Sequence, residues 1–491
     1  MSVAGEDGSK LAVAGVSPTA LGAPRHVCSA LFFFPRGGSA QVARALAESL
    51  ATRGWRITLA AGSLDRPGES THAPTFYAGT EVVTVDYSRA LRFADPLTAP
   101  VPFQPSYEDR QAGPDRIFAT VAGDAYERLV TAWTDALARA GAGQADLLHL
   151  HHLTPTHEAA VRAFPSLPIV GQLHGTELAL LRTLATGQYS GWRYPRIWEE
   201  RLRRWGGTCA RLIVPPGAEP EVATLLGLER SRLHGLPSGV ELERFRQQPL
   251  LGEARRAFWR RWLVEDPQGW DELARPGSVS YRDDDLAAFS SEPVLLYLGR
   301  FTAVKRLPLL IDAHARAQAR LGRACPLVLV GGHPGEWEGE HPLATIRRLG
   351  AEQVFLAGWR PHDELPQALN AADVLVLPSV AEAFGLALVE AMACGLPVIA
   401  CDSHGPAELV RDGESGWLVA PDDRRALEQA LIDVVTRPDE RYRRGQEAAT
   451  DARQRFGWAA IAAQVAALYE RVIREHERAG FAQKRGVRAQ G

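Results

Sequence analysis

Residues 379–390 read Ser-Val-Ala-Glu-Ala-Phe-Gly-Leu-Ala-Leu-Val-Glu, and this stretch decides the fold of the second half of the chain. It follows an apolar run, Asp373-Val-Leu-Val-Leu-Pro378, whose length, branched side chains and closing proline are typical of a buried parallel strand. It leads into Leu386 to Met392, which has the composition of a helix and stops before a glycine and a proline. The sequence therefore predicts strand, loop and helix, with Glu382 in the loop and Glu390 about one turn into the helix.

The start of this helix predicts an anion site. The backbone N–H groups of Phe384, Gly385 and Leu386 have no partner inside the helix, and the glycine lets a ligand approach them closely. The two carboxylates cannot bind the same anion, so we place them on its neutral neighbours. Glu390 is assigned to a pair of hydroxyls such as a ribose, and Glu382 to sugar hydroxyls. A ligand with phosphates between two polyols is a nucleotide sugar.

A family resemblance rests on the same residues. Glu382 and Glu390, with seven residues between them, framed by Ala-Phe-Gly and followed by Ala391-Met-Ala-Cys-Gly-Leu-Pro-Val-Ile-Ala400, resemble the glutamate motif of the retaining family 4 glycosyltransferases. The resemblance covers most of Val27 to His476 and is more specific in the second half. It implies an α/β protein with the GT-B fold, in which two Rossmann-like domains with parallel sheets face a central cleft. The second domain then binds the donor and the first binds the acceptor.

The pattern Gly-Arg-x4-Lys begins at Gly299 and contains Arg300 and Lys305. It follows a predicted strand at 293–298. The resemblance assigns both cations to the donor diphosphate, where negative charge grows as the glycosidic bond breaks. Two cations and a helix dipole can replace a divalent metal, so the sequence predicts neither a metal nor another cofactor. The family retains anomeric configuration by front-side attack, in which the leaving phosphate takes the acceptor proton. No general base is therefore assigned.

Further site residues are predicted at the ends of other strands. Pro168 to Glu177 is predicted to run from a strand into a loop, and the resemblance places His174 over the transferred sugar. The catalytic set is thus His174, Arg300, Lys305 and Glu382. Gly37 and Gly38 follow the first predicted strand and make room for substrate, or form a tight turn only. The nucleobase, of UDP or GDP, is expected to contact backbone groups from Gly358 to Arg360.

Three other clusters have competing interpretations. His149, His151 and His152 suggest a metal, but no cysteine or acid completes a ligand set, which favours hydrogen-bonding histidines. Asp283-Asp-Asp285 lies in an apparent insertion at about 250–291 and is interpreted as solvated. The aromatic and arginine residues of 192–205 are interpreted as a core helix rather than a membrane-docking one, so membrane contact is not expected.

Composition narrows the class of protein. The 491 residues carry a net charge of −3, which gives no electrostatic case for a nucleic-acid partner. The five cysteines are scattered and odd in number, and no apolar run approaches about 18 residues, so a reducing cytoplasm is expected. Small polar partners, a nucleotide sugar and an acceptor, are predicted. The oligomeric state, the acceptor residues and the role of 65–125 stay open.

The domain boundaries follow from the predicted elements. Leu212 to Pro215 is predicted to be the last strand of the first domain, and an amphipathic helix from Trp458 to cross back onto that domain. The divisions are a flexible leader at 1–25, an acceptor domain at 26–225, a donor domain at 226–455, a crossing helix at 456–478 and a flexible tail at 479–491.

The leading hypothesis is a metal-independent retaining glycosyltransferase acting on a small acceptor through a hydroxyl, amine or thiol. The richness in Ala, Arg and Gly suggests a high-GC genome, and the tryptophan-rich insertion resembles actinomycete enzymes of secondary metabolism. Four alternatives stay open: a nucleotide-sugar 2-epimerase, a membrane-associated glycolipid glycosyltransferase, a dinucleotide-dependent dehydrogenase and a non-catalytic sugar-binding module.

Overall fold

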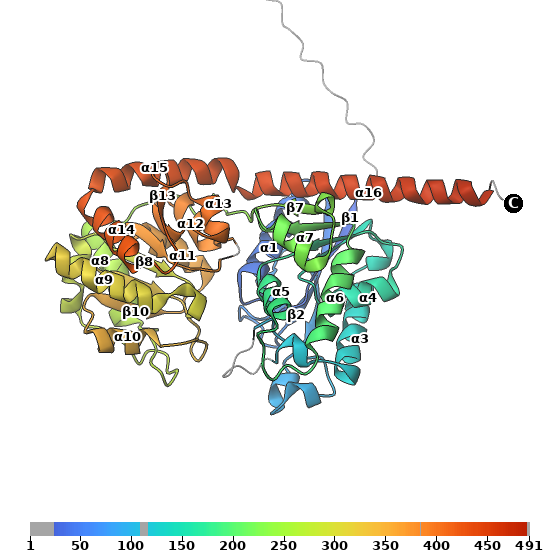
Figure 1. The fold of residues 1–491 in the computed structure, drawn as a ribbon, viewed down its shortest axis with the longest axis horizontal. Coiled ribbons are helices and arrows are strands. Elements are labelled where there is room, and N and C mark those ends of the chain that lie inside the picture. Colours follow the sequence, from blue (N-terminus) through green and yellow to red (C-terminus); the bar gives the residue numbers. More distant parts are fainter. Residues whose placement is uncertain (1–23, 109–115, 383, 489–491) are drawn as a thin grey trace, which may run out of the picture.

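The computed structural model describes residues 24–108, 116–382 and 384–488, and it has two α/β halves, each built on one parallel sheet (Figure 1). A long C-terminal helix runs along one side of the molecule from the second half back over the first (Figure 1). This is the GT-B arrangement that the sequence predicts. The predicted leader up to residue 23 lies outside the described residues.

The first sheet is parallel and has the strand order β3-β2-β1-β4-β5-β6-β7. Its strands are β1 His26–Leu31, β2 Arg56–Ser63, β3 Glu81–Asp86, β4 Leu147–His151, β5 Ile169–Gln172, β6 Arg211–Val214 and β7 Leu233–Gly235. The prediction that the first domain ends with the strand at 212–215 was wrong, because β7 pairs with β6 beyond it. The sheet therefore extends past the predicted boundary at residue 225, which falls inside a helix.

Helices cover both faces of this sheet. They are α1 Gly38–Ala51, α2 Ala73–Phe76, α3 Gly123–Arg139, α4 Pro155–Ala163, α5 Thr176–Thr186, α6 Pro195–Thr208 and α7 Glu219–Leu226, with short 3-10 turns at Ala90–Arg92, Pro96–Thr98, Phe118–Thr120, Ala142–Gln144 and Arg230–Arg232. Trp198 and Trp205 of α6 are fully buried, which confirms their interpretation as core residues. Phe103, Tyr107 and Phe118, from the segment that sequence reasoning could not place, join the same core.

The second sheet is also parallel, with the order β10-β9-β8-β11-β12-β13. Its strands are β8 Leu295–Leu298, β9 Leu327–Val330, β10 Val354–Gly358, β11 Val374–Leu377, β12 Val398–Cys401 and β13 Gly416–Val419. The helices around it are α9 Leu307–Leu321, α10 Pro342–Leu349, α11 Leu365–Asn370, α12 Leu386–Ala393, α13 His404–Leu409, α14 Arg424–Thr436 and α15 Pro438–Arg455, with 3-10 turns at Ala303–Lys305 (η8) and His362–Glu364 (η9). The predicted sequence of strand, loop and helix at 373–392 is confirmed by β11 and α12.

The predicted insertion covers the edge of this sheet. It folds into α8 Gly252–Arg260, a π-helical turn η6 at Arg261–Glu265 and a 3-10 helix η7 at Asp283–Ser290. Trp259, Trp262 and Trp270 are buried in the core of the second half. The backbone N–H of Leu356 in β10 donates to the Tyr281 hydroxyl at 2.7 Å. Because β10 is an edge strand, this cover shields backbone groups that would otherwise be open to pairing.

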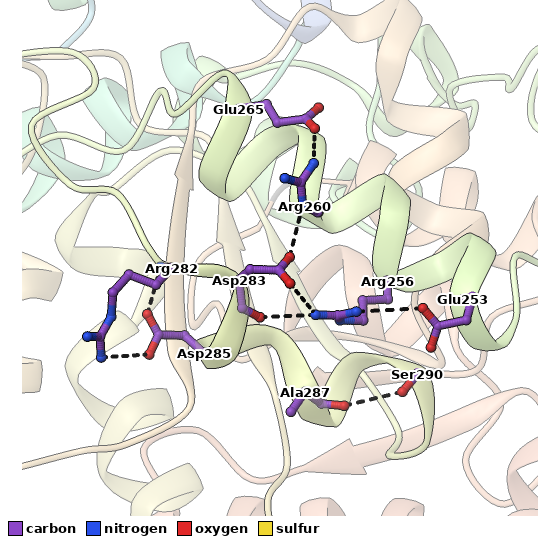
Figure 2. A network of polar contacts seen from close by, with 9 residues as sticks. All are labelled: Glu253, Arg256, Arg260, Glu265, Arg282, Asp283, Asp285, Ala287 and Ser290. Atoms are coloured by element: carbon purple, nitrogen blue, oxygen red, sulfur yellow. Dashed lines mark hydrogen bonds and ion pairs between the residues drawn. The ribbon is translucent and has the colours of Figure 1, made fainter.

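The sequence suggested that the acidic run of the insertion is solvated, and this interpretation was wrong for two of its three carboxylates. Asp283 accepts hydrogen bonds from Arg256 at 2.6 Å and from Arg260 at 2.9 Å, so it ties η7 to α8 (Figure 2). Asp285 caps the same helix by accepting from the backbone N–H of Arg282 at 2.8 Å (Figure 2). The run therefore fastens the insertion together, because two arginines of a neighbouring helix satisfy its first carboxylate.

The crossing helix is α16, Trp458–Arg488. Its apolar side, which includes Ile461, Val465 and Val472, packs in one cluster with residues of β1 and α1. The hydroxyl of Tyr469 lies 2.6 Å from Nδ1 of His149 in β4. The helix thus lies against the first half, and it continues to Arg488, past the predicted start of the tail at residue 479.

Candidate active site

Loops from the two halves meet where strands of both sheets end. Arg300, two residues after β8, donates two hydrogen bonds of 3.0 and 2.8 Å to Glu108 of the first half. Arg36, after β1, pairs with Glu336 of the second half at 3.4 Å. Open α/β sheets bind ligands at the carboxyl ends of their strands. The contact between these ends makes this region the candidate site.

Arg300 is held through its backbone as well as its guanidinium. The buried phenol of Tyr297 donates to the Arg300 carbonyl at 2.6 Å. Burial, reinforced by the negative charge of Glu382, raises the pKa of Tyr297 well above its ordinary value, so the phenol stays a proton donor. The Arg300 side chain as a whole is 43% exposed. The loop after β8 is therefore fixed, while the cation that it carries stays accessible.

The predicted loop cation and loop carboxylate meet in the structure. Lys305, at the end of η8, forms an ion pair with Glu382, and the two side chains are only 16% and 19% exposed. The two loops are also joined through their backbones, since the N–H of Val380 donates to the carbonyl of Val304 at 3.0 Å. Two motifs that are 77 residues apart thus form one polar unit.

The helix that starts beside this unit is α12, and Gly385 is its N-cap. Gly385 has φ +97°, and an added Cβ would lie 2.9 Å from the Leu388 side chain, so a glycine is required here. The first N–H groups of such a helix point outward and favour an anion. The Phe384 ring packs near the Phe456 ring. Leu386 packs both against the core of the second half and against the apolar cluster that α16 forms with β1 and α1.

Glu390 lies deeper than expected for an open ribose site. It is 3% exposed, and its Oε1 lies 2.6 Å from Nε2 of His362, in the 3-10 turn η9. A ribose contact would therefore use the other carboxylate oxygen or displace the histidine. Sequence reasoning missed His362, because a histidine in a short turn shows no motif. The assignment of Glu390 to ribose stays a prediction.

His174 belongs to a cluster at the ends of β4 and β5. Its Nε2 lies 2.9 Å from Nδ1 of His151, and its backbone N–H donates to Glu177 at 3.0 Å. Glu177 also bonds Nδ1 of His152 at 3.1 Å. Burial lowers the pKa of both His151 and His174 well below the ordinary value, so both imidazoles are neutral near pH 7.

Glu177 is the buried carboxylate of this cluster. Burial alone would raise its pKa, but the electrostatic interaction and the hydrogen bond with His152 outweigh that effect and hold the pKa of Glu177 at about 2. The Tyr107 ring lies 5.9 Å from the His152 ring, and the next residue, Glu108, binds Arg300. This path connects the histidine cluster to the cationic loop.

The remaining predicted residues differ in their surroundings. A Cβ added at Gly37 or Gly38 would meet nothing within 4 Å among the described atoms, which leaves the predicted space for a substrate. Gly358 is different, because a Cβ there would lie 2.0 Å from the carbonyl oxygen of Gln268. A glycine is required at this position because the backbone of the insertion lies directly against it. Whether either segment binds a ligand stays a prediction.

The side chain of Arg360 is directed into the insertion. Its guanidinium donates to the Asp266 carboxylate at 2.7 Å and lies 4.7 Å from the centroid of the Trp262 ring. It is 7% exposed, so this side chain supports the fold and cannot also face a nucleobase. The prediction for this segment concerned its backbone groups, and that part stays open.

Within residues 24–108, 116–382 and 384–488, no group of three or more His, Cys, Asp or Glu side chains is arranged to hold a metal ion. The clustered histidines instead pair with Tyr469, with Glu177 and with one another.

Among the helices of residues 24–108, 116–382 and 384–488, none combines the length and the apolar character that a membrane span needs.

Comparison with known proteins identifies the family. The family described as "Glycosyl transferases group 1" matches residues 282–451, and "Glycosyltransferase Family 4" matches residues 36–244. A D-inositol 3-phosphate glycosyltransferase of Streptomyces bingchenggensis is 31% identical over 348 residues, which cover 68% of this chain and 69% of that protein. This chain belongs to the group 1 glycosyltransferases.

Two further relatives of this group 1 glycosyltransferase are also actinobacterial. A D-inositol 3-phosphate glycosyltransferase 2 of Catenulispora acidiphila is 31% identical over 52% of this chain and 54% of its own length. An alpha-D-kanosaminyltransferase of Streptomyces kanamyceticus is 29% identical over 41% of this chain and 54% of its own length. This glycosyltransferase thus spans about half the length of several curated relatives that it matches.

Solved structures show the same fold. Sucrose-phosphate synthase from Thermosynechococcus elongatus superposes with a TM-score of 0.66 at 20% identity, over 92% of this chain and 100% of that one. The Anabaena protein HepE in complex with UDP-glucose superposes with a TM-score of 0.62 at 20% identity, over 91% and 99%. At this identity the likeness establishes the GT-B fold of the glycosyltransferase and nothing about its substrates.

Proposed function

We propose that this glycosyltransferase retains anomeric configuration and transfers a sugar from a nucleoside diphosphate sugar to a small polar acceptor without a metal. The proposal is carried by the ion pair of Lys305 with Glu382, which lies three residues before the N-cap of α12, and by Arg300, which lies on the same loop after β8 as Lys305. The two cations and the helix N-terminus offer a diphosphate three sources of positive charge. Each charge-assisted contact stabilises the developing charge by about 1.5–3 kcal/mol.

The carboxylates define where the neutral parts of the donor bind. Glu382, paired with Lys305, is assigned to hydroxyls of the transferred sugar, and Glu390 to the ribose. His174 approaches the same sugar from the first half. No side chain is assigned as a general base, since the leaving phosphate oxygen takes the acceptor proton in front-side attack. The first half selects the acceptor.

Donor and acceptor classes are proposed from the relatives. We take UDP-sugars as the first donors to test, since HepE was solved with UDP-glucose, and GDP-sugars as the rival. A relative named for D-inositol 3-phosphate supports a small hydroxylated acceptor such as a cyclitol. A relative named for kanosaminyl transfer supports an amino sugar as one group to test on the donor, and a role in secondary metabolism. All five cysteines lie in the described residues and are unpaired and buried, which supports a reducing cytoplasmic location.

The test is a turnover assay with a panel of UDP- and GDP-sugars and small polyol acceptors, in EDTA, with product stereochemistry read by NMR. We expect an acceptor glycoside with the anomeric configuration of the donor, at a rate that added Mg²⁺ or Mn²⁺ does not raise. An inverted product would contradict retention, and turnover that requires a divalent ion would contradict metal independence. Release of an epimerised sugar without acceptor would favour the 2-epimerase alternative.

A further inference from the structure

His174 is engaged through one particular ring nitrogen. Its Nε2 lies 2.9 Å from Nδ1 of His151, the last residue of β4. The two rings are stacked, with centroids 5.2 Å apart and planes 28° apart. The backbone N–H of His174 is fixed separately by Glu177 at 3.0 Å. With Nε2 bonded to His151, Nδ1 is the ring nitrogen of His174 that remains for a ligand.

His151 is itself held from behind. His149 and His151 are two positions apart in β4, so their side chains lie on the same face of the sheet. Their ring centroids are 4.3 Å apart, and Nδ1 of His149 lies 2.6 Å from the hydroxyl of Tyr469 in α16. Both histidines are 1% exposed. A continuous row of rings thus runs from the crossing helix to the candidate site.

We propose that His151 is a positioning residue for glycosyl transfer, which holds the imidazole of His174 through Nε2 so that Nδ1 faces the transferred sugar. The proposal rests on the proposed function, in which His174 contacts that sugar. One proton lies between Nδ1 of His151 and Nε2 of His174, so one ring donates and the other accepts. The ring orientation of His174, and the role of its Nδ1 as donor or acceptor, are then set by His151.

Substitutions at His151 separate positioning from simple space filling. The side-chain amide of asparagine places a polar atom near the position of Nδ1, whereas that of glutamine places one near Nε2. His151→Asn therefore keeps a partner for His174, and His151→Gln and His151→Leu remove it. The experiment compares these three variants with His174→Ala and with the double variant His151→Leu/His174→Ala, using one UDP-sugar and one acceptor that the wild type turns over.

We expect His174→Ala and His151→Leu each to lower kcat by about 10²-fold while the donor KM stays close to that of the wild type, since misplacement by about 1 Å has this effect. The double variant should be no slower than His174→Ala, because both changes remove the same interaction. His151→Asn should recover most of the lost kcat, and His151→Gln should not. The affinity for the free nucleoside diphosphate and the melting temperature of each variant report on folding.

Equal activity of His151→Asn and His151→Gln would overturn the positioning role, as would losses that multiply in the double variant. This pair of polar variants carries the test if His151→Leu does not fold. An unchanged kcat in His174→Ala would overturn both the sugar contact and the positioning. Failure of the wild type to transfer any sugar would instead contradict the proposed function.

Discussion

The two halves of the candidate site use different chemistry to hold polar groups in place. The second half presents charge: Arg300 and Lys305 each face a carboxylate, and at least Arg300 remains accessible. The first half presents neutral rings, because burial keeps His151 and His174 uncharged. The difference matches the two parts of a donor, since a diphosphate needs cations and a sugar needs neutral hydrogen-bonding groups. We therefore assign binding of the diphosphate to the charged second half and orientation of the sugar to the neutral first half.

The largest effect is expected at Lys305. Lys305→Ala removes a cation from the developing charge of the leaving group, and removal of one such electrostatic contact lowers kcat by about 10²–10³-fold. Steady-state kinetics with a UDP-sugar measures this. Arg306→Ala is the matched control, because the neighbouring Arg306 pairs with Asp422 on the surface. Equal losses in the two variants would mean that Lys305 has no special role.

Acid should affect the first half through its buried histidines. Burial lowers the pKa of His149 and of His157 to about 3, so each is neutral in the folded state and protonated in the unfolded state between about pH 3 and 6.5. The unfolded state binds more protons in this window, so stability falls as the pH falls through it. At pH 5 each histidine costs up to about 2 kcal/mol.

His157→Leu tests this contribution, since both ring nitrogens of His157 lack a partner among the described residues. We expect urea unfolding of His157→Leu to show a smaller loss of free energy between pH 7 and pH 5 than the wild type. His476→Leu, on the exposed side of α16, serves as the exposed-histidine control. An unchanged pH dependence in His157→Leu would show that this residue is not the source of the acid sensitivity.

Glu108 sharpens the comparison because it joins the halves. Its carboxylate occupies two donor groups of Arg300 that a diphosphate would also use. Glu108→Gln removes this competing charge, so the affinity for a nucleoside diphosphate should rise by about tenfold, the equivalent of one charge-assisted bond. Calorimetry measures the change, with Glu336→Gln as the matched interdomain control. Weaker binding by Glu108→Gln would show that Glu108 orients Arg300 rather than competing for it.

The smallest effect is expected far from the site, in the insertion. Asp283→Asn weakens an ion pair network that is about half exposed, so the free energy of unfolding should fall by less than about 1 kcal/mol. Nucleotide affinity should stay at the wild-type value in EDTA and in Mg²⁺. A divalent-dependent change in this variant would reverse the interpretation of the acidic run as a fastening for the insertion.

The same contrast explains how much could be predicted from the sequence. Glu382 and Gly385 lie in one short run of strand, loop and helix, so local pattern places them correctly. Glu108 lies in an irregular segment without a repeating pattern, and its contact with Arg300 spans 192 residues. Tertiary contacts of this kind, like the pairing of Glu390 with His362, leave no local signal.

The errors in the fold prediction have related causes. The strand β7 has three residues, which is too short for a hydrophobic pattern to show. Arg360 follows a strand end, a position typical of ligand binding, yet the insertion takes its guanidinium. The insertion was recognised by its tryptophans, but its attachment to β10 could not be read from them. Long-range packing determines these positions, whereas local motifs determine the strand, loop and helix at 373–392 of the second half.

The most direct test of the central claim is a calorimetric titration with UDP and GDP in EDTA, comparing the wild type with the Arg300→Ala/Lys305→Ala double variant. Our account predicts that one nucleotide binds the wild type without metal and that the double variant loses this binding. His174→Ala should keep it, because that residue belongs to the neutral half. Wild-type affinity in the double variant, or binding that appears only with a divalent ion, would contradict the account.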